Sequence, residues 1–248
     1  MENNIKYIKS SLNDEIAYCH NDIGSDISIF FFGGYSSNMT GTKATALSKW
    51  CLENKYNFTR FDYSGHGQSG GKFEDGGITK WSIEANEVFQ NFKNKKNIII
   101  GSSMGGWISL LVAKRNIETI HGLIGIASAP DFVVGEWNRL SEDQKDKIKK
   151  EGKIIINWDD YEDDYVITYK FLKDGMKNML LKDIIPITCP IRLLHGKLDN
   201  VVSTNVSQTI IEKIQSKDKD LIIIDDGDHS LSRDSDLNLL FNKIEELV

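Results

Sequence analysis

The chain has 248 residues, a formal net charge of −6 and a hydrophobic content of 40%. This length suits one large domain with room for an insertion, and this apolar content is enough for a sizeable core, which excludes wholesale disorder. The acidic balance excludes the positive surface that binding to nucleic acid or to an anionic membrane requires.

Short apolar runs alternate with longer helical patterns along the chain, which indicates βαβ units around a mostly parallel sheet. Several runs are almost continuously apolar, as expected for strands that are buried on both faces. The first two runs are short and flanked by polar residues, so we predict an antiparallel hairpin at one edge. The eight predicted strands are IKYI (5–8), EIAYC (15–19), ISIFFFG (27–33), FTRFDYS (58–64), NIIIG (97–101), LIGIAS (123–128), IRLLHG (191–196) and LIIIDD (221–226).

Helical patterns fill the gaps between these runs. In the second helix, Ile78, Trp81 and Val88 follow a roughly helical rhythm, which indicates a face packed on the core. The last helix has Asp234 at its start, where an acidic side chain suits the helix dipole. The predicted fold class is therefore α/β, with a mostly parallel eight-stranded sheet flanked by helices. The predicted helices are 42–54, 78–93, 105–116, 205–216 and 234–248.

The alternation stops between Asp131 and Pro186, where charged helical patterns follow one another without a convincing buried strand. An insertion at the carboxyl edge of a parallel sheet would lie over the ligand crevice. We therefore predict an α/β core formed by 1–131 and 187–248, with 132–186 as a small helical cap or lid.

The predicted cap contains an acidic cluster. Its spacing lacks the alternating oxygen ligands and central glycine of a calcium loop, so a solvated acidic surface is favoured over a metal site. The cluster consists of Asp159, Asp160, Glu162, Asp163 and Asp164.

Between the fifth predicted strand and the following helix, the stretch GSSMG (101–105) fits the pattern G-x-S-x-G. A serine at the tip of such a sharp turn needs residues without side chains two positions before and two positions after it. Ser103 satisfies this with Gly101 and Gly105, whereas Ser102 would have Ile100 and a methionine there. The motif is short, and a serine needs a base to become a nucleophile. We therefore looked for an acid and then a histidine after it in the chain.

Of the five histidines, His229 alone follows the last predicted strand and precedes the last helix. Asp199 lies in the loop after the preceding strand, where it could hold the tautomer of His229 and stabilise the imidazolium. His195 ends that strand but comes before any suitable acid, so we set it aside as the base. Three other candidates for the acid, Asp225, Asp226 and Asp228, are close to His229 in the sequence. Neighbours on the same turn are poorly placed to reach the ring nitrogen of His229 that faces away from the serine.

Acyl transfer also needs donors for a developing oxyanion. The pair Gly33-Gly34 follows a strand and precedes a helix, which makes the N–H of Tyr35 one expected donor. The N–H of Met104, directly after the predicted nucleophile, is the other. An ordinary strand-to-helix turn is the simpler explanation of Gly-Gly, but the neighbouring motifs favour the functional one.

The glycine-rich stretch DYSGHGQSGG (62–71) lacks the spacing of a dinucleotide loop and leads into no helix, so we predict a structural loop. We interpret His66 within it as a turn residue, and Trp107 after the serine motif as a packing residue. No metal or cofactor is required by any motif found.

These motifs together resemble the α/β-hydrolase superfamily over nearly the whole chain. More narrowly, several stretches are similar to a group of mitochondrial abhydrolases described as acyl-protein thioesterases and acyl-glucuronide esterases, and to their short bacterial relatives. In that group the serine, aspartate and histidine at Ser103, Asp199 and His229 are the triad. The stretches are GGYSSNMTGTKA (33–44), RFDYSGHGQSGG (60–71), GSSMGGWISLL (101–111) and CPIRLLHGKLD (189–199).

Cysteine usage and the amino-terminal sequence predict where the protein resides. Cys19, Cys51 and Cys189 are far apart, which indicates reduced thiols rather than a disulfide framework. The first twenty residues have neither a signal-peptide core nor an Arg-rich transit pattern, and no apolar run reaches the ~18–20 residues of a membrane span. We therefore expect a cytoplasmic protein of the bacterial type, without stable membrane insertion.

The leading interpretation is a serine hydrolase that cleaves carboxylic esters or thioesters of a small-molecule or acylated substrate through an acyl-enzyme. A peptidase or a C–C bond hydrolase would use the same triad. A binding protein that keeps the fold without turnover is a further alternative, which the presence of all three residues disfavours.

Overall fold

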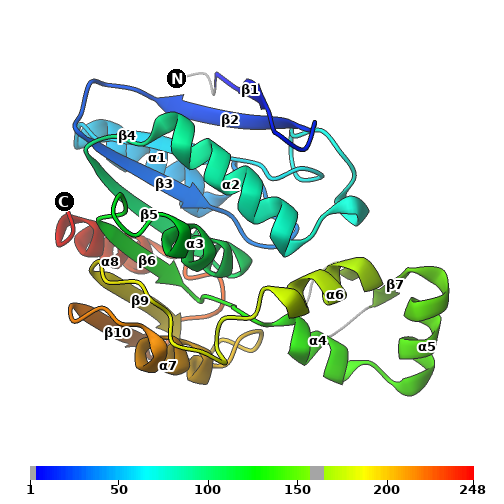
Figure 1. Cartoon of the computed structure of the whole chain (residues 1–248). Coiled ribbons are helices and arrows are strands. Elements are labelled where there is room, and N and C mark those ends of the chain that lie inside the picture. The colour runs from blue at the N-terminus through cyan, green and yellow to red at the C-terminus, as the bar shows by residue number, and fades with distance from the viewer. Residues whose placement is uncertain (1–3, 157–164) are drawn as a thin grey trace.

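The computed structural model describes residues 4–156 and 165–248, and an eight-stranded sheet forms its centre (Figure 1). The strands are β1 (Lys6–Lys9), β2 (Glu15–Asn21), β3 (Ile27–Phe32), β4 (Asn57–Phe61), β5 (Lys96–Ser102), β6 (Gly122–Ile126), β9 (Ile191–Gly196) and β10 (Lys219–Ile224). They lie in the order β1-β2-β4-β3-β5-β6-β9-β10. The predicted strands and the mostly parallel α/β fold are thus confirmed.

The pairing pattern matches the predicted edge hairpin. β1 pairs with β2 in antiparallel orientation, and β2 pairs with β4 in the same way. From β4 to β10 every neighbouring pair is parallel. The carboxyl ends of β3, β5, β6, β9 and β10 therefore meet at one edge of the sheet, where ligands bind in open α/β sheets.

Helices cover both faces of the sheet. One face packs against α1 (Thr42–Glu53) and α8 (Asp234–Glu245), and the other packs against α2 (Ile78–Phe92), α3 (Met104–Arg115) and α7 (Thr204–Lys213) (Figure 1). A short 3₁₀ turn spans Phe73–Asp75 before α2.

The central strand β5 explains why the apolar runs are almost continuous. Ile98 and Ile100 point into the core beneath α1 and α8, whereas Ile99 points into the core beneath α2 and α3. Successive side chains of a strand alternate between its two faces, so a strand with helices on both sides is apolar at every position.

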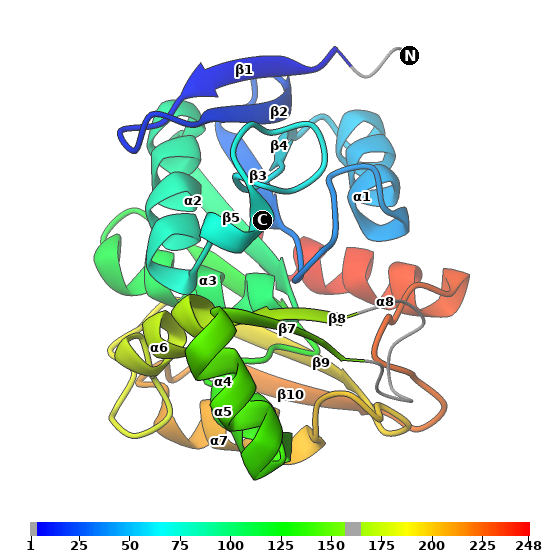
Figure 2. The ribbon, with the colours of Figure 1, turned by 90° about the vertical axis from the view of Figure 1, so that its right-hand side faces the viewer.

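The segment between β6 and β9 extends beyond the carboxyl ends of the strands (Figure 1). In the view toward those ends, it lies in front of the sheet (Figure 2). It contains α4 (Val133–Arg139), α5 (Glu142–Glu151), β7 (Lys153–Ile156), β8 (Tyr165–Thr168) and α6 (Tyr169–Lys177). α4 packs against α6, and α6 packs against α2 of the core. The acidic cluster predicted here as a solvated surface lies outside the described residues.

Two strands of this segment were not expected from the sequence. β7 and β8 have four residues each and pair antiparallel in a separate two-stranded sheet. α5 ends at Glu151, and the next residue, Gly152, terminates it in the left-handed conformation with a φ of 83°, which lets β7 begin. A four-residue apolar run does not reveal by its pattern whether it forms a strand or a helix, which explains the omission.

Asp131 joins the two ends of the inserted segment. Its carboxylate accepts hydrogen bonds from the backbone N–H of Leu180 at 2.8 Å and of Leu181 at 2.9 Å. Asp131 immediately precedes α4, and the two leucines follow α6, so this carboxylate closes the insertion at its base. Burial raises the pKa of the Asp131 carboxyl above its ordinary value, against the two backbone bonds that lower it.

Candidate active site

Ser103 lies at the turn between β5 and α3 in a strained backbone conformation. Its φ of 54° and ψ of −119° are unusual for a residue with a side chain, and such outliers cluster at functional sites. Neighbouring backbone holds the turn: the N–H of Ser103 donates to the Ile126 carbonyl at 2.9 Å, and the Ser103 carbonyl accepts from the N–H groups of Gly106 and Ala129. These three backbone hydrogen bonds therefore hold Ser103 in its strained conformation.

The two glycines that flank this turn are required by close packing. A Cβ on Gly105 would lie 2.1 Å from the Phe32 carbonyl oxygen, and a Cβ on Gly101 would lie 2.3 Å from the Gly105 carbonyl oxygen. Real Cβ atoms do not approach backbone so closely, so side chains at these positions would push α3 away from β3 and β5. The spacing of glycines around Ser103 therefore has the steric cause expected from the sequence.

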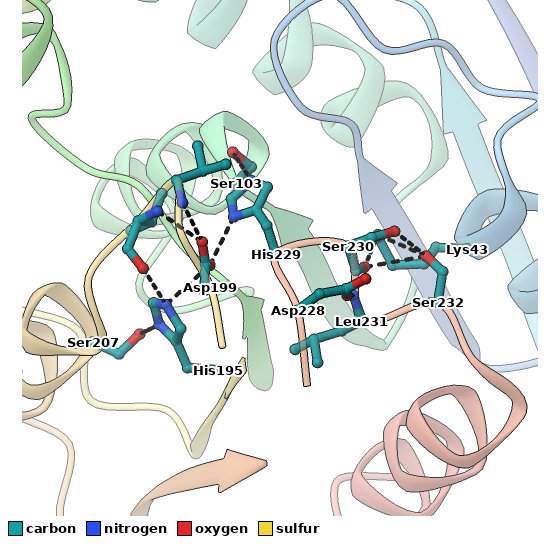
Figure 3. A network of polar contacts seen from close by, with 12 residues as sticks. Lys43, Ser103, His195, Asp199, Ser207, Asp228, His229, Ser230, Leu231 and Ser232 are labelled. Atoms are coloured by element: carbon teal, nitrogen blue, oxygen red, sulfur yellow. Dashed lines mark hydrogen bonds and ion pairs between the residues drawn. The ribbon is translucent and has the colours of Figure 1, made fainter. Parts of the chain in front are cut away.

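Three side chains from distant parts of the chain form a hydrogen-bonded row (Figure 3). Nε2 of His229 lies 3.1 Å from Oγ of Ser103, and Nδ1 of His229 lies 2.7 Å from Oδ2 of Asp199. An ionised carboxylate only accepts hydrogen bonds, so Nδ1 of His229 carries a proton and the Nε2 lone pair faces the Ser103 hydroxyl. This arrangement lets the imidazole take the serine proton.

The side chain of Asp199 is fully buried, and both oxygens of its carboxylate accept hydrogen bonds. Oδ1 accepts from the N–H groups of Val201 and Val202, each at 2.8 Å. Burial by itself raises the pKa of this carboxyl, but hydrogen bonds from His195 and His229 outweigh it and hold the pKa well below its ordinary value.

The three rival aspartates are engaged elsewhere. Asp225 pairs with Lys197 at 2.8 Å, and Asp226 pairs with Arg233 at 2.7 Å. The carboxylate of Asp228 accepts from the N–H of Leu231 at 2.8 Å. None of these contacts reaches the ring of His229, and the structure brings Asp199 there instead.

The expected oxyanion donors lie on either side of Ser103. Met104 is the first residue of α3, where backbone N–H groups have no partner within the helix and the dipole favours negative charge. A Cβ on Gly34 would lie 3.4 Å from Cβ of Ser103, so the loop that carries Tyr35 runs beside the serine. Tyr35 and Ser103 line the same cavity.

The side chain of Tyr35 connects this loop to the insertion. Its hydroxyl donates to the carbonyl of Val166 in β8 at 2.7 Å. Its ring packs against five aromatic rings from the core and the insertion, so the position of the predicted donor depends on both. The rings are Phe73, Trp81, Phe132, Tyr165 and Phe171.

A cavity of about 640 Å³ opens in front of Ser103. The cavity wall includes polar residues such as Ser36, Ser37, Asn38, Lys43, Glu136, Asn200, Ser230 and Ser232. It also includes apolar and aromatic residues such as Ala129, Phe132, Tyr165, Val201 and Val202. The site can therefore contact both polar and apolar groups of a ligand.

Two residues at the site were missed by the sequence reasoning. Lys43 of α1 donates to the carbonyl of Ser230 and to Oγ of Ser232 at 3.2 Å, which ties down the segment just after His229. Burial lowers the pKa of Lys43 to about 8. No local pattern distinguishes this lysine from a surface lysine. His195, which we did not choose as the base, contacts Asp199. The stretch HGKLD places the two residues four positions apart, and this spacing was the signal that could have predicted the contact.

The two residues interpreted as structural lie away from the reacting row. His66 is buried in the loop after β4, its Nδ1 3.3 Å from the Ser64 carbonyl, and burial lowers its pKa to about 4. Trp107 is buried in α3 and donates to the carbonyl of Asn178 at 3.1 Å. Across the described ranges 4–156 and 165–248, no helix is both long and apolar enough to cross a membrane.

Comparisons of the sequence with known families and proteins give consistent matches. Residues 26–158 and 161–236 match the serine aminopeptidase (S33) family. The mitochondrial palmitoyl-protein thioesterase ABHD10 of Rattus norvegicus is 35% identical over 229 residues, which cover 91% of this chain and 76% of that protein. The same protein of Homo sapiens is 34% identical over 226 residues, with coverage of 91% and 74%.

Solved structures match over the whole fold. The α/β hydrolase domain-containing protein 10 from mouse aligns with a TM-score of 0.90 and 33% identity, covering 98% of each chain. A protein of Agrobacterium vitis S4 described as a hydrolase aligns with a TM-score of 0.93 and 31% identity, covering 100% of each chain.

Proposed function

This chain belongs to the α/β-hydrolase superfamily and to its serine aminopeptidase (S33) family, and from that premise we propose that Ser103, His229 and Asp199 are its catalytic triad. It is a serine hydrolase of esters or thioesters. The observation that carries the proposal is the row from Oγ of Ser103 through His229 to the buried carboxylate of Asp199, at 3.1 Å and 2.7 Å. This row opens into the cavity that Ser103 and His229 line.

The geometry supports a two-step reaction. Oγ of Ser103 attacks the carbonyl carbon while Nε2 of His229 takes the hydroxyl proton, and Asp199 stabilises the resulting imidazolium. The negative charge on the former carbonyl oxygen is stabilised by the N–H groups of Tyr35 and Met104. Collapse of the tetrahedral intermediate breaks the bond to the alcohol or thiol, which leaves with the proton from His229. Water, deprotonated by His229, then attacks the acyl-enzyme and releases the acid.

The substrate class follows from the relatives and from the cavity. Relatives at 33–35% identity are named palmitoyl-protein thioesterases, which supports an acyl ester or thioester. The partly apolar, partly polar wall suits an acyl group beside a polar leaving group. The substrate is a small molecule or an acylated partner.

The inserted segment 132–186 acts in this proposal as a cap over the core formed by 1–131 and 187–248. Three residues of the insertion, Phe132, Glu136 and Tyr165, belong to the cavity wall, which supports a role in admitting or selecting the substrate.

A cytoplasmic location is the proposed compartment, and it is supported by the free thiols of Cys19, Cys51 and Cys189. The ABHD10 relatives carry a mitochondrial designation in their names. Fractionation of the source cells followed by immunodetection separates the two locations, because a protein found only in a membrane-bound compartment contradicts the proposal.

The test of the triad uses Ser103→Ala. We expect the variant to lose hydrolysis of p-nitrophenyl esters and acyl thioesters by at least roughly 10⁴-fold, and to lose labelling by a fluorophosphonate, because no other group supplies the nucleophile. Thermal unfolding checks that the variant remains folded. Labelling and turnover that survive in the folded variant would show that another residue attacks.

A peptidase is the second candidate, because the matched family is described as a serine aminopeptidase. Rates on a dipeptide p-nitroanilide, an ester and a thioester of matched acyl groups distinguish the candidates. A kcat/KM that is highest on the dipeptide favours the peptidase, and no turnover of any substrate favours a binding protein of this fold.

A further inference from the structure

The buried carboxylate of Asp199 serves two histidines at once (Figure 3). Oδ2 lies 2.7 Å from Nδ1 of His229 and 3.2 Å from Nε2 of His195. Together with the N–H groups of Val201 and Val202 on Oδ1, this gives the carboxylate four donors. The reaction proposed above uses one of the two histidines, and nothing in it explains the second.

The partners of His195 determine which of its nitrogens carries the proton. Nε2 faces the Val202 carbonyl at 2.9 Å and Oδ2 of Asp199 at 3.2 Å, and both are acceptors only, so Nε2 must be protonated. In the neutral ring Nδ1 then accepts, and the hydroxyl of Ser207 lies 2.7 Å away to donate to it. Ser207, from α7, thus fixes the tautomer whose Nε2 proton is shared between the Val202 carbonyl and Asp199.

His195 contributes to this network from behind the site and not from the cavity. Its side chain is fully buried and Ser207 is almost fully buried, and neither lines the cavity in front of Ser103. Val202 closes a loop around the pair, because its N–H donates to Asp199 while its carbonyl accepts from His195. The histidine can therefore affect the reaction only through Asp199 and its loop.

We propose that His195 is a positioning residue of the hydrolase: with its tautomer fixed by Ser207, it donates to Oδ2 of Asp199 and keeps that buried carboxylate ionised and directed at His229. The inference rests on the proposed triad and extends it by two residues, to the row Ser103–His229–Asp199–His195–Ser207. No proton is transferred to or from His195 during turnover. The stabilising role of the hydrogen bond on the ionised carboxylate agrees with the low pKa of Asp199.

The test compares His195→Leu, His195→Gln and Ser207→Ala by steady-state kinetics on one p-nitrophenyl ester. Leucine removes the donor, and we expect kcat to fall roughly 10- to 100-fold, as for loss of a hydrogen bond to a charged group, with KM nearly unchanged. Glutamine can donate to Asp199 and accept from Ser207, so it recovers most of this loss. Alanine at 207 removes a bond between neutral groups, so kcat falls only about 2- to 10-fold.

Ser216→Ala is the matched control, because it also removes an almost fully buried hydroxyl. The hydroxyl of Ser216 lies near the amino-terminal end of β10, away from the proposed site, and donates to the Asp218 carbonyl. Its kcat should equal that of the unmodified protein. A purely packing role for His195 would change KM and thermal stability together with kcat, without recovery by glutamine, and this result overturns the proposal.

Three further outcomes are decisive. If His195→Leu does not fold, the kinetics of His195→Gln and Ser207→Ala test the proposal. An unchanged kcat in Ser207→Ala then contradicts the role of the fixed tautomer. If Ser103→Ala remains active, the triad itself is wrong. If Ser103→Ala is inactive while folded His195→Leu keeps full kcat, the triad stands and this inference alone fails.

Discussion

The two sides of the site are built from different interactions. On one side, the ends of β5, β9 and β10 carry Ser103, Asp199 and His229, which are joined by short hydrogen bonds to a fully buried carboxylate. On the other side, the insertion contacts the core through packed aromatic rings around Tyr35 and through the hydrogen bonds of Asp131 at its base.

The difference follows from what each side has to do. Hydrogen bonds between ionised and polar groups depend steeply on distance and angle, so the proposed proton transfer is favoured by residues that stand at fixed strand ends. Aromatic contacts are less directional, and their strength grows with buried area. In an insertion held in this way, the residues that line the cavity can change without disturbing the hydrogen-bonded row on the other side. Variants on the strand-end side should therefore lower kcat, whereas variants at the base of the insertion, away from the rings around Tyr35, should mainly change KM.

The largest effect is expected on the strand-end side, from Asp199→Asn. The amide can donate to Nδ1 or leave it unbonded, which favours the wrong tautomer of His229 and removes the charge that stabilises the imidazolium. We expect kcat to fall by roughly 10³–10⁴-fold, by analogy with the same change in the serine protease triad. Stopped ester hydrolysis assays with active-site titration measure it.

Asp225→Asn is the matched control for this prediction, because Asp225 is close to His229 in the sequence but pairs with Lys197 on the surface. Its activity should stay near that of the unmodified protein. If Asp225→Asn, rather than Asp199→Asn, abolishes turnover, the acid has been assigned to the wrong loop.

On the insertion side, Asp131→Ala should have an intermediate effect. It leaves the N–H groups of Leu180 and Leu181 without their acceptor, so the free energy of unfolding should fall by about 2–3 kcal/mol. Because the variant does not touch the triad, KM should rise while kcat on a small ester changes little. Urea denaturation and steady-state kinetics measure the two effects.

Asp146→Ala provides the comparison, since this aspartate lies within the insertion but pairs with Lys149 on the exposed face of α5. Exposed pairs contribute about 0–1 kcal/mol, so neither stability nor KM should change much. A large loss of kcat in Asp131→Ala, with KM unchanged, would mean that the insertion takes part in the chemical step and that the two sides are not separable.

The smallest effect is expected from Ser102→Ala, one residue from the proposed nucleophile. Ser102 is the last residue of β5 and pairs with Ile126, so its backbone conformation is that of a regular strand. Removing its hydroxyl should leave stability within about 0.5 kcal/mol and should preserve fluorophosphonate labelling. Loss of labelling in Ser102→Ala but not in Ser103→Ala would reverse the assignment of the two serines.

The sequence by itself determined the sheet and the serine turn, because both depend on local patterns. Strands buried on two faces must be apolar throughout, as Ile98, Ile99 and Ile100 are, and a turn as tight as that at Ser103 admits only glycine at its flanks. The order serine, aspartate, histidine along the chain then followed from the succession of strand ends. The short strands β7 and β8 were not predicted, since four residues are too few for their pattern to distinguish a strand from a helix.

Which groups are in contact depends on the tertiary structure. Asp225, Asp226 and Asp228 are nearer to His229 along the chain than Asp199 is, yet the parallel pairing of β9 and β10 brings the loop after β9 against the histidine. The same closure places His195 behind the acid, Lys43 against the segment after His229, and Tyr35 against the insertion. These contacts depend on how distant elements pack in three dimensions, and no local spacing of residues encodes a distance between two loops.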